Sequence, residues 1–325
     1  MLHHKCCLIC LLVIFIMLSS SSNNKIESDK KIAFLFMARG VMPLEDIWRE
    51  FFRWHANTSH YTIHMHVHRG FKYPQSSFFH GKELSESEDV KWGNMGQVRG
   101  IKRLVRAALQ DPLVEWFALM SESCIPLHPF EKWRQGLLSF NKSIINACAM
   151  HWSEMETETR WRPSLDKVGM NKTSWRKSAT WFALNRKHAL VFVNETALEP
   201  GWESVPCCDE HYLPSILAYN GLDNETTCSD GFVHAHFPSL SASHPWTYSG
   251  DEITAELFTH LSHPIGNHAG FGMQCSGVQD LCHFTARKFS GNSKYQLLEN
   301  IDLLLSSDEH QYNGNPWDHH QDKLD

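Results

Sequence analysis

Two adjacent carboxylic acids near the middle of the chain are the first candidates for chemistry. Asp209 and Glu210 open a predicted helix over residues 209–219. The dipole of a helix stabilises acidic side chains in its first turn, which gives Asp209 an ordinary structural role. Glu210 points to another side of the helix, where a carboxylate can accept a proton from a substrate. From spacing alone, a structural and a catalytic role for Glu210 both remain open.

Two adjacent cations late in the chain, Arg287 and Lys288, stand between the apolar residues Ala286 and Phe289. An arginine fork and a lysine point charge together can hold a diphosphate. The alternative interpretation is the solvated edge of a strand.

Three histidines alternate along a predicted strand over residues 61–67. Alternate residues of a strand share a face, so His64, His66 and His68 would project together, as zinc ligands do. A polar strand face near the end of a sheet is the alternative, and the sequence places no carboxylate partner beside them.

The motif Asp-x-Asp, which holds the metal bridge of many sugar-nucleotide enzymes, is absent from the sequence. The nearest acidic pairs are Glu86 with Glu88 and Glu154 with Glu156, and both lie in segments that we expect to be exposed loops. Glycine-rich phosphate loops are absent as well. An enzyme of this chain that used a sugar nucleotide would therefore need cationic side chains in place of the metal.

The elements that must position these residues begin as an alternation of strands and helices. A continuous apolar run ends at Arg39, as a buried strand ending in a loop would. Strand, helix, strand is the unit of a parallel sheet, so the first 150 residues indicate a doubly wound α/β half with ligands at the strand ends. The predicted strands are residues 32–37, 61–67, 116–120 and 144–150, and the predicted helices are a segment opened by Pro43 and residues 97–109 and 129–140.

The second half has a weaker pattern. Residues 151–180 have no clear period and indicate loops and short strands. Helices are predicted over residues 186–194, 209–219 and 295–305, and we expect the tail over residues 306–325 to be disordered.

Length and charge limit the number of domains and the kinds of partner that we expect. The chain has 325 residues, of which 42% are hydrophobic, enough for one large domain or two tightly packed halves. The net charge is -6 with no basic block, so the electrostatic footprint for nucleic acid is missing and we expect no nucleic-acid partner.

The N-terminus carries a secretory-pathway signal. An apolar run from Cys6 to Leu18 is followed by serines and asparagines, and both a cleaved signal peptide and an uncleaved anchor over residues 1–22 remain open from these residues. No later stretch is apolar enough to span a membrane, so the remainder should lie on one side of it, after a short stem over residues 23–30.

Acceptor sites and cysteines agree with passage through the lumen. Beyond the N-terminal segment there are seven cysteines, of which Cys275 and Cys282 could close a local loop, while Cys207 or Cys208 could reach Cys228. An odd number leaves one thiol free or intermolecular. Five Asn-x-Ser/Thr sites for glycosylation are present, at Asn57, Asn141, Asn171, Asn194 and Asn224.

Read in order, seven blocks of the sequence resemble the plant-type branch of the core-2/I-branching β-1,6-N-acetylglucosaminyltransferase family. Blocks in the family's order are more specific than any single motif, and they extend from residue 30 to about residue 300. The matching stretches cover residues 32–40, 90–93, 119–127, 175–182, 209–214, 244–245 and 286–289.

The resemblance implies a type II Golgi membrane protein with a lumenal GT-A-like α/β fold: a Rossmann-type mixed sheet flanked by helices in a single catalytic domain over residues 31–305. Residues 31–150 would form the nucleotide-sugar half and residues 151–305 the acceptor half. It implies an inverting, metal-independent transfer from a UDP-sugar, typically UDP-N-acetylglucosamine, to a glycan or glycoprotein acceptor.

Site residues follow from the same resemblance. Glu210 corresponds to the catalytic base and Lys288 to a lysine that contacts the diphosphate. We expect Arg39 and Arg287 on the donor as well, and Glu122, Trp175 and Trp181 on the acceptor. After the second strand this chain has His68 where the animal enzymes have an acidic residue that holds uracil, and the counterpart of their second diphosphate-binding arginine does not stand out near residues 263–272.

Two other functions compete with this one. The first is a non-catalytic, glycan-binding descendant of the fold that keeps its aromatic sugar platforms. The second is a zinc enzyme that uses the face of His64, His66 and His68.

Overall fold

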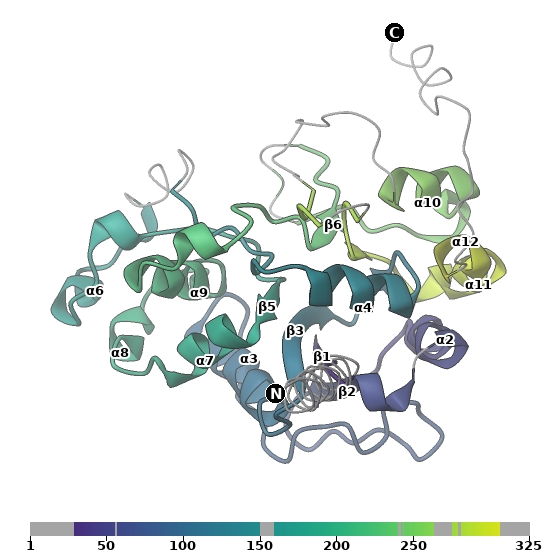
Figure 1. Cartoon of the computed structure of the whole chain (residues 1–325), viewed down its shortest axis with the longest axis horizontal. Coiled ribbons are helices and arrows are strands. Elements are labelled where there is room, and N and C mark those ends of the chain that lie inside the picture. The colour runs from purple at the N-terminus through teal and green to yellow at the C-terminus, as the bar shows by residue number, and fades with distance from the viewer. Residues whose placement is uncertain are drawn as a thin grey trace, which may run out of the picture.

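A four-stranded sheet in the order β2-β1-β3-β5 forms the centre of the protein (Figure 1). The computed structural model describes residues 29–55, 57–149, 159–239, 242, 244–262, 275–278 and 281–305. β1 (Lys31–Met37) pairs in parallel with β2 (Tyr61–His66) and with β3 (Val114–Ser121), whereas β5 (Ala183–Asn185) is antiparallel to β3. The sheet is therefore mixed, and its three parallel strands end at one edge.

β1 is buried on both faces, so its alternate residues belong to two different cores. Phe34 and Phe36 face α2 (Glu45–His55) and α4 (Phe130–Ser139), and Phe36 meets Trp48 edge to face at 5.0 Å. Ala33 and Leu35 face α3 (Met95–Ala108), α7 (Arg186–Asn194) and α9 (Cys208–Tyr219). This is the GT-A-like arrangement predicted from the sequence, a mixed sheet with helices on both faces.

A buried lysine ties the helices of the second core together. Lys102 on α3 is fully buried, its ammonium donates to the hydroxyl of Tyr212 on α9 at 2.8 Å, and it is ion-paired with Glu199 of α8 (Glu199–Trp202). A buried charge costs much free energy unless it is paired and hydrogen-bonded, and here it is both. The start of α9, with Asp209 and Glu210, thus rests on a fixed helix layer.

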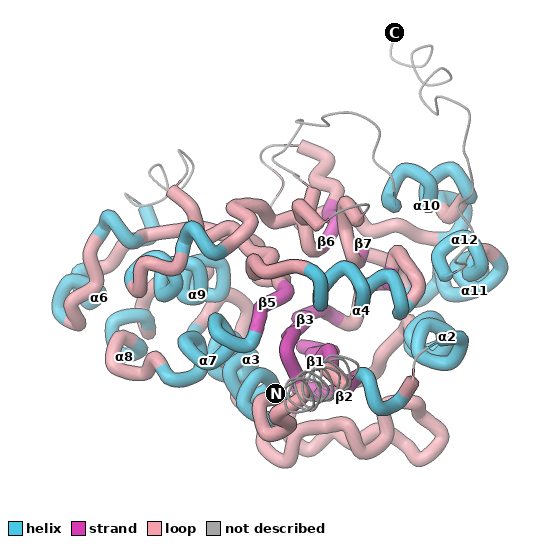
Figure 2. Tube along the Cα trace, in the orientation of Figure 1, coloured by secondary structure: helices cyan, strands magenta, loops and turns pink. Residues whose placement is uncertain are grey.

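A second, smaller sheet has the strand order β4-β7-β6. Figure 2 labels two of its strands, β6 and β7. β7 (Thr285–Arg287) is central, antiparallel to β4 (Ile125–Pro126) and parallel to β6 (Val233–Ala235). Because β4 follows β3 after a short turn, this sheet brings Arg287 and Lys288 next to the end of β3. The remaining helices are α6 (Pro163–Lys167), α10 (Ala255–Ser262), α11 (Lys294–Glu299) and α12 (Ile301–Leu305).

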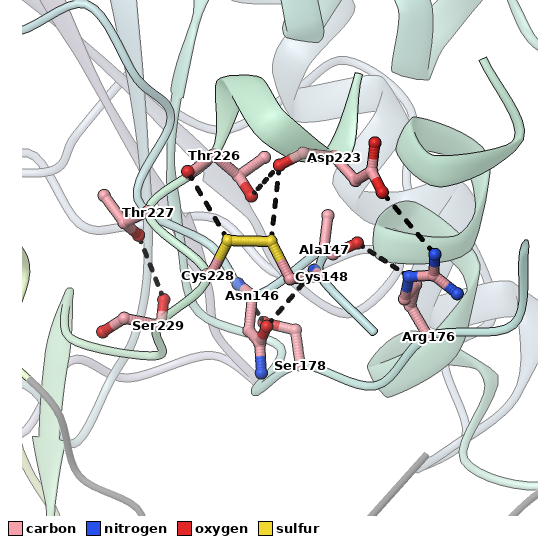
Figure 3. Close-up of a disulfide and its surroundings, with 10 residues drawn as sticks. All are labelled: Asn146, Ala147, Cys148, Arg176, Ser178, Asp223, Thr226, Thr227, Cys228 and Ser229. Carbon is pink, nitrogen blue, oxygen red and sulfur yellow. Dashed lines mark hydrogen bonds and ion pairs between the residues drawn. A yellow bond between two sulfur atoms is a disulfide. The ribbon is translucent and has the colours of Figure 1, made fainter. Parts of the chain in front are cut away.

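Two disulfides cross-link the described residues. Cys275 pairs with Cys282, a pairing that their spacing allowed, and Cys228 pairs with Cys148 and not with Cys207 or Cys208 (Figure 3). Spacing did not reveal this pair, because Cys148 comes 80 residues earlier than Cys228 and only the fold brings its Cα to 5.1 Å from that of Cys228. Cys124 and Cys208 are free thiols, and burial raises the pKa of Cys208 to about 12.

The predicted strand over residues 144–150 is wrong for the part that the structure describes. Ile144 makes a single bridge to Ala183, and its neighbours run as irregular chain. An apolar run of that length is ambiguous, because a buried loop that packs against a sheet produces it too. The predicted helix over residues 295–305 is interrupted at Asn300 and forms α11 and α12.

Several predictions concern residues at the two ends of the chain, which the structure does not describe. The N-terminal segment over residues 1–22, most of the stem, and the tail over residues 306–325 all lie outside the described residues. Within the described part, no helix combines the length and the apolar character needed to cross a membrane.

Candidate active site

A cavity of about 1100 Å³ opens where the parallel strands end. Arg39 follows β1, His68 follows β2 and Glu122 follows β3, and all three side chains line it. Ligands of open α/β sheets bind at this edge, because successive strands deliver their following loops to one place. Six of the seven predicted catalytic, donor and acceptor residues line the cavity: Arg39, Glu122, Trp181, Glu210, Arg287 and Lys288.

The acidic side of the cavity consists of Asp209, Glu210 and Asp230. Cys207 precedes α9 in a left-handed backbone conformation with φ 48°, and this turns the chain so that both acids of the first helical turn reach the cavity. Asp230 accepts hydrogen bonds from the hydroxyl of Ser178 at 2.6 Å and from the backbone nitrogen of Ala179 at 2.9 Å. Burial raises the pKa of the Asp230 carboxyl above its ordinary value.

Glu210 is held by cations. Arg160 donates to its Oε2 at 2.8 Å, and the ammonium of Lys177 lies 3.8 Å from the same oxygen. The backbone nitrogen of Ser178 donates to the Glu210 carbonyl at 2.9 Å, which fixes the loop before Trp181 against α9. The side chain is 30% exposed, so a substrate can reach it.

Asp209 is a more buried acid than its neighbour. Its Oδ2 accepts from the hydroxyl of Thr180 at 2.7 Å and from the amide of Gln97 at 3.0 Å. Burial raises the pKa of Asp209, although the bond from Thr180 opposes this shift. Asp209 thus links the start of α9 to Thr180 and Gln97, whereas the N-cap of α9 is Cys207 and has no side-chain cap hydrogen bond.

We call the group of Arg39, Arg287 and Lys288 the cationic side of the cavity; Arg69 lines the cavity too, and Glu122 lies close enough to Arg287 and Lys288 to raise the pKa of both. Burial lowers the pKa of both Arg287 and Lys288, and the neighbouring Arg287 lowers the pKa of Lys288 further. The guanidinium of Arg287 lies 4.8 Å over the ring of Trp181, and its buried Nε has no hydrogen-bond partner among the described residues. A half-buried guanidinium with an unpaired Nε beside a second cation suits an anionic ligand.

Trp175 corrects the sequence interpretation. It is 2% exposed and does not line the cavity. Its ring stacks on Trp202 at 5.6 Å and on His211 at 4.2 Å, inside the second core. It cannot offer a face to a sugar in this arrangement, and its role is packing under the start of α9.

His64 and His66 alternate with the core residues Ile63 and Met65 along β2, but β2 ends at His66, so His68 does not share this strand face, and the three rings have different partners. His64 bonds the hydroxyl of Thr62 at 3.1 Å, His66 accepts from the backbone nitrogen of Glu88 at 3.0 Å, and His68 bonds the carbonyl of Arg39. Within the described ranges, no group of three or more His, Cys, Asp or Glu side chains is arranged to hold a metal ion. The zinc hypothesis therefore gains no support from these histidines.

Several cavity residues escaped the sequence reasoning. Gln97, Thr180 and Asp230 contact or accompany the acidic side, and Arg160 pairs with Glu210. Thr180 stood within a block of the family resemblance but received no role. Gln97 and Arg160 lie in helical segments and Asp230 lies in a loop, and only the fold brings them together. Trp92 and His244 also line the cavity; both stood within blocks of the family resemblance but received no role.

The predicted glycosylation sites all lie at the surface. Asn57, Asn141, Asn171, Asn194 and Asn224 are exposed. The side chain of Asn57 accepts from the backbone nitrogen of Ser59, and that of Asn171 accepts from Ser174. Exposure makes each site available, and occupancy stays a prediction.

The acidic pair Glu154 and Glu156 lies outside the described residues.

A mixed α/β sheet with an acidic and a cationic side in one cavity at the strand ends defines a GT-A-like transferase. The particular family follows from comparison with known proteins. The family model for "Branch: Core-2/I-Branching enzyme" matches residues 32–262, and the chain belongs to this family. It is also similar to Glycosyltransferase BC10 of Oryza sativa subsp. japonica, with 27% identity over 313 residues, 83% of this chain and 76% of that protein. The protein is a glycosyltransferase.

Proposed function

We propose that the protein is an inverting glycosyltransferase that transfers a sugar, N-acetylglucosamine as the leading candidate, from a UDP-sugar to a hydroxyl of a glycan, without a metal ion. The observation that carries this proposal is the pairing of two charge types in one cavity. In this proposal Glu210 removes the proton of the acceptor hydroxyl, and Arg287 and Lys288 stabilise the charge of the leaving group.

Side chains of the cavity are sufficient for each proton and charge of this transfer. The acceptor hydroxyl gives its proton to Glu210 while its oxygen forms a bond to the anomeric carbon of the donor. The bond from that carbon to the phosphate oxygen breaks on the other face, and UDP leaves with the bonding electrons. Arg287 and Lys288 meet the charge that grows on the diphosphate, and Arg39 adds to the same side.

UDP release tests the proposal directly. The full chain, purified from a secretory host, is incubated with UDP-N-acetylglucosamine, UDP-galactose, UDP-glucose or UDP-xylose and a mixture of plant glycans, and free UDP is measured. We expect release with one donor, and sugar incorporated in equal amount. A folded protein that binds glycans but releases no UDP would support the non-catalytic descendant instead.

The cellular setting is a further part of the proposal. The apolar run before residue 22 would anchor a type II protein in the Golgi membrane, with residues 31–305 in the lumen. Five exposed acceptor sites and the disulfides of the described residues support a lumenal body. Endoglycosidase treatment should lower the apparent mass, whereas an unchanged mass together with protease sensitivity in intact microsomes would contradict this topology.

A further inference from the structure

Trp92 presents an indole to the cavity that neither core uses. It is 68% exposed, lines the cavity, and meets the imidazole of His244 edge to face with ring centroids 5.7 Å apart. An indole offers a large, rigid and partly apolar surface at a small cost in conformational entropy, which is why tryptophan is enriched at binding sites. A solvent-facing indole inside an active-site cavity is thus suited to cover the flat face of a ligand.

The backbone beside Trp92 is fixed to the acidic side. The backbone nitrogen of Cys208 donates to the carbonyl of Gly93 at 3.1 Å. The nitrogen of Gly93 donates to the amide oxygen of Gln97 at 3.2 Å, and the amide nitrogen of Gln97 donates to Asp209 at 3.0 Å.

Glycine is required at position 93. Its φ is +73°, a conformation that side chains disfavour, and an added Cβ would lie 3.3 Å from the Cα of Cys207. Trp92 is therefore held at a set position relative to the start of α9, where Glu210 lies.

His244 reaches the same place from the cationic side. Its segment pairs with the chain after β7: the backbone nitrogen of Lys288 donates to the carbonyl of Trp246 at 3.3 Å, and that of Tyr248 donates to the carbonyl of Lys288 at 2.8 Å. The contact between Trp92 and His244 thus joins the two sides of the cavity. A sugar that packs on this pair would sit between the proton acceptor and the donor diphosphate.

We propose that Trp92, with His244 at its edge, is the platform on which the acceptor sugar stacks; this rests on the proposed function. The acceptor hydroxyl must lie beside Glu210, and Trp92 is the exposed aromatic residue whose backbone is braced to that helix start. The C–H face of a pyranose or furanose ring packs on the indole, and its hydroxyls remain free for polar groups of the cavity. The donor's phosphates belong with Arg287 and Lys288, away from this bracing.

The test measures binding of neutral sugars and of UDP separately. Methyl glycosides of galactose, glucose, N-acetylglucosamine, arabinose and xylose are titrated into the UDP-saturated full chain, followed by ligand-observed NMR. Trp92→Ala should weaken binding of the preferred glycoside roughly tenfold, while Trp92→Phe keeps most of it. UDP affinity, measured by calorimetry, should be the same in both variants. Tyr295→Ala is the matched control, because Tyr295 is 70% exposed and lies outside the cavity lining.

Three results would overturn the platform: unchanged glycoside binding in Trp92→Ala, loss of UDP binding in place of glycoside binding, or a wild-type protein that binds UDP and none of the glycosides. Failure of the wild-type protein to bind UDP would count against the proposed function instead. In that case the titrations are repeated without UDP, and the same comparison of Trp92→Ala with wild type still decides the role of Trp92.

Discussion

Arg160 joins Glu210 and His211: one of its guanidinium nitrogens lies 2.8 Å from the Glu210 Oε2 and 2.9 Å from the imidazole Nε2 of His211. The other ring nitrogen of His211 bonds the carbonyl of Arg176 at 2.7 Å. Both cations that contact Glu210, Arg160 and Lys177, reach the same oxygen. We therefore expect Oε1 to be the atom that receives the acceptor's proton.

Glu210→Gln should reduce sugar transfer by roughly 10²-fold or more, the usual scale for general base catalysis, because the amide keeps the size of the side chain and cannot take up the proton. UDP affinity should change little, since Glu210 belongs to the acidic side. Transfer is measured as UDP release in the presence of acceptor. The matched variant Glu203→Gln, at a carboxylate 57% exposed and outside the cavity lining, should leave transfer unchanged. Full activity in a folded Glu210→Gln protein would show that the base lies elsewhere, with Glu122 or Glu156 as the next candidates.

Lys288→Ala should weaken UDP binding roughly tenfold, because a charge-assisted contact to the diphosphate is lost. The loss should shrink as salt is added, since screening reduces the contribution of the wild-type lysine at this partly buried site. Calorimetry with UDP at two salt concentrations measures both effects. Lys187→Ala, an exposed lysine paired with Glu225, serves as the control. Equal UDP affinity in Lys288→Ala and wild type would remove Lys288 from the donor site.

Chelation should leave activity intact, if the cations replace a metal bridge. The expectation is motivated by the absence of Asp-x-Asp and by the cationic side around Arg287. The enzyme is dialysed against EDTA and UDP release is compared with and without added manganese. Activity that disappears on chelation and returns with manganese would contradict the cationic account, and a carboxylate such as Glu154 would then need to be considered as a ligand.

Stability should fall between pH 6.5 and pH 4 in part because of His64. Burial lowers the pKa of His64 to about 4, from 6.5 in the unfolded chain, and Lys82 adds to the shift. The unfolded state therefore binds more protons than the folded state in this window, so acid favours unfolding. His64→Gln should flatten the pH dependence of the free energy of unfolding by roughly 2 kcal/mol across the window. Urea titrations at several pH values give this difference, and parallel curves for variant and wild type would contradict the assignment.

The sequence predicted the frame of the site because the frame depends on strong local patterns. A strand such as residues 32–37, buried on both faces, gives a continuous apolar run, and the residue after it, Arg39, stands at the ligand-binding edge. The helix over residues 186–194 has the predicted bounds. The order of the blocks added Glu210 and Lys288, which no periodicity distinguishes from surface charges.

Trp175 shows where sequence reasoning stops. Trp175 is followed by two cationic residues, Arg176 and Lys177, and such a sequence is typical of an exposed segment. Arg176 is nevertheless only 8% exposed. The guanidinium of Arg176 donates to the carbonyls of Ala147, Thr173 and Trp175, and these hydrogen bonds satisfy the buried cation. A charge next to an aromatic residue therefore does not reveal which side of the chain faces water. Contacts between residues far apart in sequence, such as Gln97 with Asp209, had no local signal at all.

The antiparallel pairing of β3 with β5 bears on the order in which the protein forms. Trp116 to Ala118 of β3 pair with Ala183 to Asn185 of β5, which are made much later. The edge of β3 therefore stays unpaired until the ribosome has made and released the chain up to β5. An open edge of buried strands is a template for pairing with other chains. Arg287 and Lys288 follow about a hundred residues later. During synthesis, Asp209, Glu210 and Asp230 are therefore made before Arg287 and Lys288, so the cavity has its full set of charged side chains only after Lys288 has been added.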